Sequence, residues 1–133
     1  IIQGSINDRR SGMAGYREAV ESAWDAMAAL YPDASIVILG PAPHQLPIGK
    51  ATARIDSDLA TLASNRGWWY ISPIERDWIT EENYGDIIDV GIGRMHPSTN
   101  GHRYLAEKLT EALHELVGAA LTEAGESEQT PER

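Results

Sequence analysis

Apolar residues along this chain follow two spacings, and each spacing predicts one kind of element. Steps of three and four residues predict amphipathic helices over 13–30 and 49–66, and a last helix that starts near Ser98. Short continuous apolar runs with β-branched members predict buried strands at 1–4, 35–39 and 68–71. We expect Pro32 to stop the first helix and Gly67 to end the second.

The order of these elements predicts an α/β fold. Strands that alternate with helices form a parallel sheet with right-handed crossovers. We therefore expect a flavodoxin-like, three-layer αβα arrangement. A long loop with a short helix near 74–78 should connect the last strand to the last helix. Ligands of such sheets bind beyond the carboxyl ends of the strands. Residues 4–8, 40–47 and 72–96 follow the strands, so functional chemistry is expected there.

The 133 residues suit one domain, which we place at 1–121. Residues 122–133 are rich in Glu, Ser, Gly and Pro without periodicity, which is typical of a flexible acidic tail. The chain opens on Ile1 rather than methionine, inside a predicted strand. We expect that another segment once preceded it.

Charge and cysteine content exclude several classes of function. The chain carries 11 Lys+Arg and 20 Asp+Glu, a net charge of −9, and no basic stripe. This balance argues against binding to nucleic acid or to anionic lipid. Without cysteine there is no disulfide, thiolate zinc site or cysteine nucleophile, and the compartment stays open. No apolar run approaches the roughly 20 residues that span a bilayer.

His96 is the first candidate for chemistry. Pro97 disfavours a helical backbone at His96, so the imidazole should lie just before the last helix, which Ser98 or Thr99 can cap. A histidine held in such a loop can act as a general base near neutral pH. The alternative is a histidine that only forms a turn.

Asn7 is the second candidate, in the segment directly after the first strand. Gly4 lets the backbone turn sharply there, and the Asn7 amide is a neutral donor that could stabilise a developing oxyanion. The alternative is an ordinary Asx turn, in which Asn7 or Asp8 bonds its own loop.

These two motifs, in this order and at this spacing, resemble the SGNH hydrolases, also called GDSL-type esterases. The matching segments are Gly4-Ser5-Ile6-Asn7-Asp8, Ile38–Pro43, Trp69–Pro73 and His96-Pro97-Ser98-Thr99-Asn100-Gly101-His102. The resemblance implies a serine ester hydrolase that acts on a small ester, such as an acylated carbohydrate or lipid, without a cofactor. It makes His96 the general base and Asn7 a donor to the oxyanion.

The family's nucleophile is missing from this sequence. Neither its Gly-Asp-Ser block nor the block that supplies a glycine N–H to the oxyanion occurs here. The chain therefore looks like the C-terminal part of such a domain, with only the last three strands and their helices. The expected partner is the N-terminal half that carries the serine, as a separate chain or a lost segment. We expect this chain alone to be inactive.

Two further positions depart from the family pattern. Gly93 stands where an aspartate usually precedes the histidine. Asp89 could reach the imidazole instead, or a backbone carbonyl could orient it in a Ser–His dyad. Ser5 replaces a usual glycine, and its hydroxyl could line the substrate pocket. His44, after the second strand, could also face substrate; the alternative is a polar loop residue among prolines.

Other functions remain open at this point. The missing serine and aspartate also fit a non-catalytic binding or structural module of the same fold within a larger assembly. A different flavodoxin-like domain could match the motifs by chance, and Asn7 and His96 would then lie far apart. No metal site is expected, because His96 and His102 lack i, i+4 spacing and carboxylate partners.

Overall fold

The computed structural model describes residues 1–4, 15–89, 91 and 96–128, with side chains as far as Glu123. Three parallel strands form one sheet in the order β1-β2-β3. The strands are β1 (Ile2–Gln3), β2 (Val37–Leu39) and β3 (Trp69–Ile71). The helices are α1 (Tyr16–Leu30), α2 (Lys50–Asn65), α3 (Tyr84–Ile87) and α4 (Thr99–Glu128).

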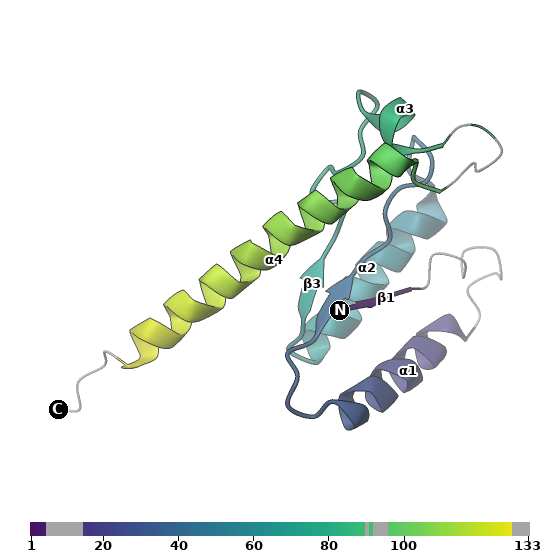
Figure 1. The fold of residues 1–133 in the computed structure, drawn as a ribbon. Helices are drawn as coiled ribbons and strands as arrows, with labels where there is room; N and C mark the ends of the chain where they lie inside the picture. Colours follow the sequence, from purple (N-terminus) through teal and green to yellow (C-terminus); the bar gives the residue numbers. More distant parts are fainter. Residues whose placement is uncertain (5–14, 90, 92–95, 129–133) are drawn as a thin grey trace.

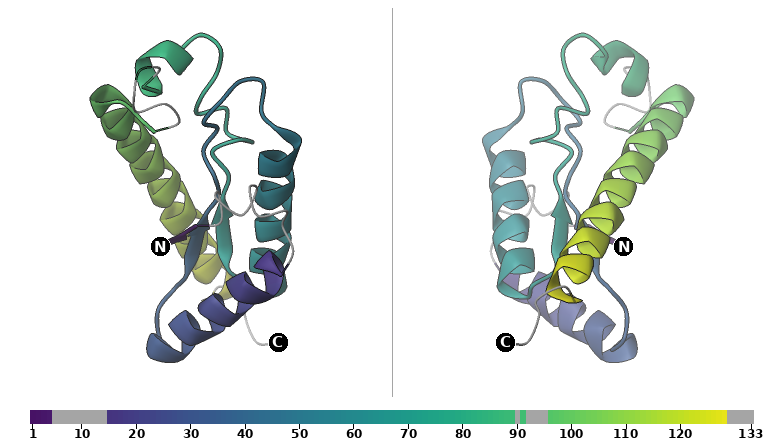
Figure 2. Two further views of the ribbon diagram at one scale, coloured as in Figure 1. Left: turned by 90° about the vertical axis from the view of Figure 1, so that its right-hand side faces the viewer. Right: turned by 90° about the vertical axis from the view of Figure 1, so that its left-hand side faces the viewer.

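The helices form layers on both sides of the sheet. Helices α1 and α2 cover one face and α4 covers the other, as the views in Figures 1 and 2 agree. This arrangement confirms the predicted αβα architecture with a parallel sheet. Helix α4 also extends well beyond the strands (Figure 1).

Alternating side chains of β2 divide the core in two. Ile38 packs toward α1 and α2, whereas Val37 and Leu39 pack toward α4. All three are buried, which explains why the strand is a continuous apolar run. The cluster toward α1 and α2 contains Tyr16, Val20, Trp24, Ile38, Ile55, Leu59, Leu62 and Ala63.

The ends of α2 follow the predicted local chemistry. Gly67 has a φ of 68°, and its N–H donates to the Ser64 carbonyl at 3.0 Å. The Trp68 N–H reaches back to the Ala63 carbonyl, also at 3.0 Å. These two bonds satisfy carbonyls at the end of the helix and turn the chain into β3.

Two predicted boundaries need revision. Residues 73–77 form turns rather than the expected helix, since the Trp78 N–H closes back on the Pro73 carbonyl at 3.0 Å and Asp77 has a φ of 49°. The short helix is α3, later in the same connection. Helix α4 continues to Glu128 and so includes the first residues of the predicted tail, where Glu and Ala favour helix.

No helix in the described part of the chain combines the length and the apolar character that a membrane span requires.

Candidate functional site

The loop that carries His96 pairs with the end of α3. Ile88 and Pro97 form an isolated antiparallel bridge, and the Asp89 N–H donates to the His96 carbonyl at 3.0 Å. On the other side of Pro97, the Ser98 N–H donates to the Ile87 carbonyl at 2.8 Å. Pro97 is therefore held between two backbone bonds, one of which uses the His96 carbonyl, while the His96 side chain is exposed.

Ser98 joins this loop to the first turn of α4. Its hydroxyl oxygen accepts the Gly101 N–H at 3.0 Å and donates to the Asp86 carbonyl at 2.6 Å. The predicted cap is thus confirmed at Ser98, with a second bond that the sequence did not indicate. One hydroxyl links α3, the His96 loop and α4.

Gly101 permits this close approach. A Cβ on Gly101 would lie 2.0 Å from the Ile87 carbonyl oxygen and 2.9 Å from its carbon. Because both atoms belong to backbone, no side-chain rotation could relieve the overlap. The glycine of the histidine motif therefore brings α4 against α3.

Asp89 does not use its carboxylate on His96 in this structure. Its Oδ1 accepts the Gly91 N–H at 2.8 Å, and its side chain is exposed. The recorded bond between Asp89 and His96 joins their backbones. Within the described residues, main-chain pairing holds the backbone of His96.

His44 lies half-buried in the loop after β2. Its carbonyl accepts the Tyr84 hydroxyl at 2.9 Å, which connects this loop to α3. The same loop contributes Ala42 to the cavity described below. Ser5, Asn7 and Gly93 lie outside the described residues.

A buried polar network, which was not predicted from the sequence, lies at the carboxyl edge of the sheet. The Asp56 carboxylate, 6% exposed, accepts the Tyr70 hydroxyl at 2.6 Å and the Ser72 hydroxyl at 2.8 Å. The Ser72 oxygen also accepts the Glu75 N–H at 3.0 Å. Burial, and then the hydrogen bond to Asp56, raises the pKa of Tyr70 above its usual value of 10.0.

Gly40 makes room for this network. A Cβ there would lie 2.3 Å from the Tyr70 hydroxyl and 2.6 Å from an Asp56 oxygen. The sequence held a clue, because Asp56 directly follows an inward apolar residue of α2 and Ser72 directly follows β3. The network fixes the start of two loops at the edge where function was expected.

A cavity of about 330 Å³ lies at this edge between the strands and α4. Pro97, the residue after His96, forms part of its wall. Its lining residues are Gln3, Leu39, Ala42, Pro73, Trp78, Pro97, His102, Leu105, Ala106 and Leu109. No Lys, Arg, Asp or Glu side chain is among these residues, and most of them are apolar, so the site favours apolar ligands.

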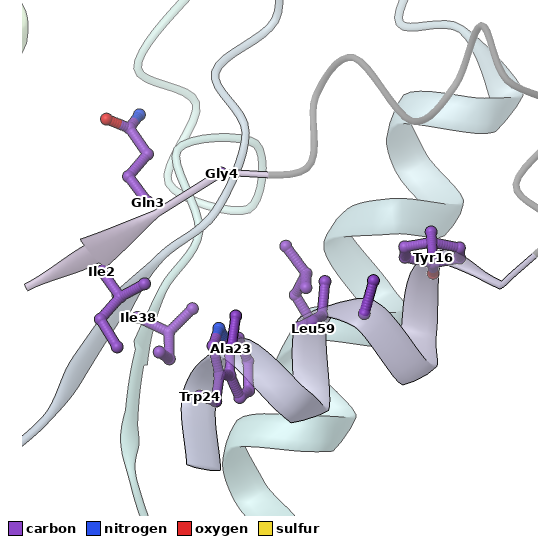
Figure 3. A pocket seen from close by; sticks show the side chains of 10 residues that line it. Ile2, Gln3, Gly4, Tyr16, Ala23, Trp24, Ile38 and Leu59 are labelled. Carbon is purple, nitrogen blue, oxygen red and sulfur yellow. The ribbon is translucent and has the colours of Figure 1, made fainter. Parts of the chain in front are cut away.

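A second cavity, of about 280 Å³, lies on the opposite face, between β1 and α1. Figure 3 shows the Ile2 side chain on the side of β1 that faces α1, near Ile38 and Trp24. The Gln3 side chain points to the other side of the strand. Strand β1 pairs with β2 and, among the described residues, with no strand on its other edge. Both cavities therefore flank a strand with a free edge.

The described residues hold no group of three or more His, Asp or Glu side chains that could bind a metal ion. His102 lies in the first turn of α4, as predicted, where its N–H donates to the Ser98 carbonyl at 2.9 Å.

Comparison with known proteins gives one relationship to report. No protein-family model matches the chain, and no solved structure matches it significantly. The chain is 28% identical over 102 residues to a GDSL lipase of Mycobacterium tuberculosis. The match covers 76% of this chain and 42% of the lipase, so this chain corresponds to less than half of that relative. The chain is thus distantly similar to a GDSL lipase, in agreement with the resemblance of its motifs.

Proposed function

We propose that this chain is part of the catalytic domain of a serine ester hydrolase in which His96 is the general base. The similarity to a GDSL lipase carries this proposal. Two features support it: the exposed imidazole of His96 follows α3 at the carboxyl edge of the sheet, and the next residue lines a cavity. The substrate would be a small ester that passes through an acyl-enzyme.

His96 would remove the proton of a serine hydroxyl as it attacks the ester carbonyl, and would return that proton to the leaving alcohol. The Asn7 amide would donate to the oxyanion that forms on the carbonyl oxygen. Ser5 and His44 would contact the substrate. The roles of Asn7 and Ser5 rest on the resemblance of their motif.

The nucleophile would come from a further segment, in the same polypeptide or in a companion chain, that lies beside β1. The free edge of β1 can accept another strand, and cavities on both of its faces leave space for one more layer of side chains. Ser72 and Ser98 are poor nucleophiles here, because Ser72 is buried against Asp56 and Ser98 caps α4.

Two arrangements could orient His96. Asp89 could turn its carboxylate toward the imidazole when substrate binds, or the backbone pairing of His96 could suffice in a Ser–His dyad. The bond from the Gly91 N–H to the Asp89 carboxylate favours the dyad. The variant Asp89→Asn distinguishes the two arrangements. In a dyad its kcat should fall less than about tenfold, whereas replacing the aspartate of a triad by asparagine lowers kcat about 10⁴-fold.

The central experiment assays the gene product that contains this chain with p-nitrophenyl butyrate. We expect His96→Ala to lower kcat by about 10³, because general-base catalysis contributes 10²–10⁴. His114→Ala, an exposed histidine further along α4, is the matched control and should retain full activity. Equal rates for His96→Ala and the parent protein would contradict the assignment.

A fluorophosphonate probe followed by mass spectrometry locates the nucleophile. Labelling of a serine outside residues 1–133 supports the composite site. Absence of both labelling and hydrolysis would favour the alternative, a non-catalytic module of the same fold. That alternative gains support from Gly93 at the usual aspartate position and from the missing Gly-Asp-Ser block.

A further inference from the structure

Helix α3, the His96 loop and the first turn of α4 form one hydrogen-bonded unit. The Ile87 carbonyl accepts the Ser98 N–H at 2.8 Å, and the Asp86 carbonyl accepts the Ser98 hydroxyl at 2.6 Å. The Asp89 N–H donates to the His96 carbonyl at 3.0 Å. Because these bonds would all be lost if the segments separated, the backbone of His96 follows any movement of α3.

Tyr84, the first residue of α3, joins this unit to the loop that contains His44. Its hydroxyl donates to the His44 carbonyl at 2.9 Å, across 40 positions of the sequence. Both segments lie at the same end of the sheet, as Figure 2 shows. One side chain therefore connects the loop of a candidate substrate contact with the helix that holds the backbone of His96.

The ring and the hydroxyl of Tyr84 make different contributions. The ring packs against a small apolar cluster that Ala42, from the loop of His44, also contacts. The buried members of this cluster are Ile79, Ile87 and Ile88. Phenylalanine at position 84 would keep these apolar contacts and lose the hydrogen bond. The loop and the helix would then be held by apolar packing, which lacks the direction that a hydrogen bond imposes.

We propose that Tyr84 is a positioning residue whose hydroxyl sets the placement of the His44 loop relative to the His96 loop. This inference rests on the proposed function for its catalytic meaning. A general base must come within about 2.6–3.2 Å of the atom whose proton it removes. A misplacement of about 1 Å can lower the rate about 10²-fold, so a bond between two loops of the site affects turnover.

The catalytic test compares Tyr84→Phe with Tyr104→Phe in the gene product that contains this chain, with p-nitrophenyl butyrate as substrate. Tyr104 is the matched control, because it packs against the same cluster and its hydroxyl accepts the Asn83 amide at 3.4 Å. Turnover is divided by the number of sites that a fluorophosphonate probe titrates, so that unfolded protein does not count. We expect this kcat to fall about three- to tenfold in Tyr84→Phe and less than about twofold in Tyr104→Phe.

Hydrogen exchange measures the same coupling without hydrolysis. The amides of Asp89 and Ser98 donate to the carbonyls of His96 and Ile87, so their exchange reports opening of the unit. The amide of Leu62, which is buried in the core on the other face of the sheet, reports global opening. In Tyr84→Phe we expect exchange at Asp89 and Ser98 to become at least about threefold faster relative to Leu62.

Three results would overturn the positioning role: an unchanged kcat per titrated site, an equal fall in Tyr104→Phe, or exchange that rises equally at Asp89 and Leu62. Absence of hydrolysis by the parent protein would overturn the proposed function instead. The exchange comparison then decides alone: faster local exchange in Tyr84→Phe would retain Tyr84 as the link between the two loops, and unchanged exchange would exclude it.

Discussion

The two faces of the sheet are built differently, although the sequence places similar apolar stripes on their helices. On the α1/α2 face, Ile55, Leu59, Leu62 and Ala63 of α2 are 0–4% exposed. On the α4 face, Ala112 is fully buried, while Leu105, Leu109, Leu113 and Leu116 are only partly buried. The α4 face also contains the cavity beside the His96 loop. Both faces border a cavity beside β1, but the inward residues of α2 are closely packed, whereas most of those of α4 are only partly buried.

Polar contacts reinforce this difference. Arg66 contacts Asp25 and lies 5.2 Å from the Trp68 ring centre, and the Tyr16 hydroxyl donates to Asp58. These contacts bind α1, α2 and the start of β3 together. On the other side of the sheet, Val117 and Leu121 of α4 are 55% and 69% exposed.

The largest expected effect comes from truncating one leucine on each face. Leu62→Ala should lower the free energy of unfolding by about 2–5 kcal/mol, because Leu62 is 4% exposed and lines neither of the two cavities beside β1, so its truncation opens a new cavity. Leu109→Ala should cost less than about 2 kcal/mol, since this side chain is partly buried and already borders a cavity. Urea denaturation measures both. Equal losses would show that the α4 face is packed as tightly as the other.

Two glycines of α4 give opposite predictions. Gly101→Ala should destabilise the protein by about 1–3 kcal/mol, because the new methyl group overlaps the Ile87 carbonyl. Gly118→Ala should stabilise it by about 0.5–1 kcal/mol, since nothing lies within 4 Å of its added Cβ. Thermal unfolding compares them. A neutral Gly101→Ala would contradict the close contact between α3 and α4.

Alkaline pH should lower the free energy of unfolding through two tyrosines on the α1/α2 side of the sheet. The raised pKa values of Tyr70 and Tyr16 mean that their neutral forms are favoured by folding. The stabilisation that these neutral tyrosines give to the folded protein is therefore complete below pH 10.0, the usual tyrosine pKa. It is lost as the pH rises above that value. Each should add a slope of about 1.4 kcal/mol per pH unit there.

Tyr70→Phe tests this linkage. It should flatten the fall in unfolding free energy between pH 10 and 11, whereas Tyr31→Phe, at a 58% exposed position, should leave it unchanged. An identical slope in Tyr70→Phe and the parent would contradict the linkage to Asp56.

The smallest expected effect concerns the cap of α4. Ser98→Ala should cost about 1 kcal/mol, because the Gly101 N–H and the Asp86 carbonyl each lose a partner. Thr99→Ala, the exposed neighbour, should change the free energy of unfolding by less than about 0.5 kcal/mol. Hydrogen exchange at Gly101 provides a local measurement, and unaltered protection in Ser98→Ala would exclude this cap.

Much of the fold could be predicted because it depends on neighbours in the sequence. The steps of three and four residues in α1, α2 and α4 specify which side of each helix faces the sheet. Gly67 and Ser98 are short-range features of this kind, since each interacts within a few residues of its own position. His96 was identifiable for the same reason, because Pro97 restricts the residue before it.

The contacts that shape the candidate site join residues far apart in the chain. Gly101 contacts Ile87, Ser98 contacts Asp86, and Asp56 meets Tyr70 and Ser72. No local pattern reports these pairings, because they form only when α3, α4, α2 and β3 pack together.

The sequence by itself determined the αβα order of elements, the parallel sheet and the segment that presents His96, because hydrophobic spacing and proline act locally. Only the tertiary structure decided that the two faces differ in packing, that backbone pairing holds His96, and that an apolar cavity lies beside it. Cavities and close backbone contacts arise from the relative placement of whole elements, and that placement is a property of the packed molecule.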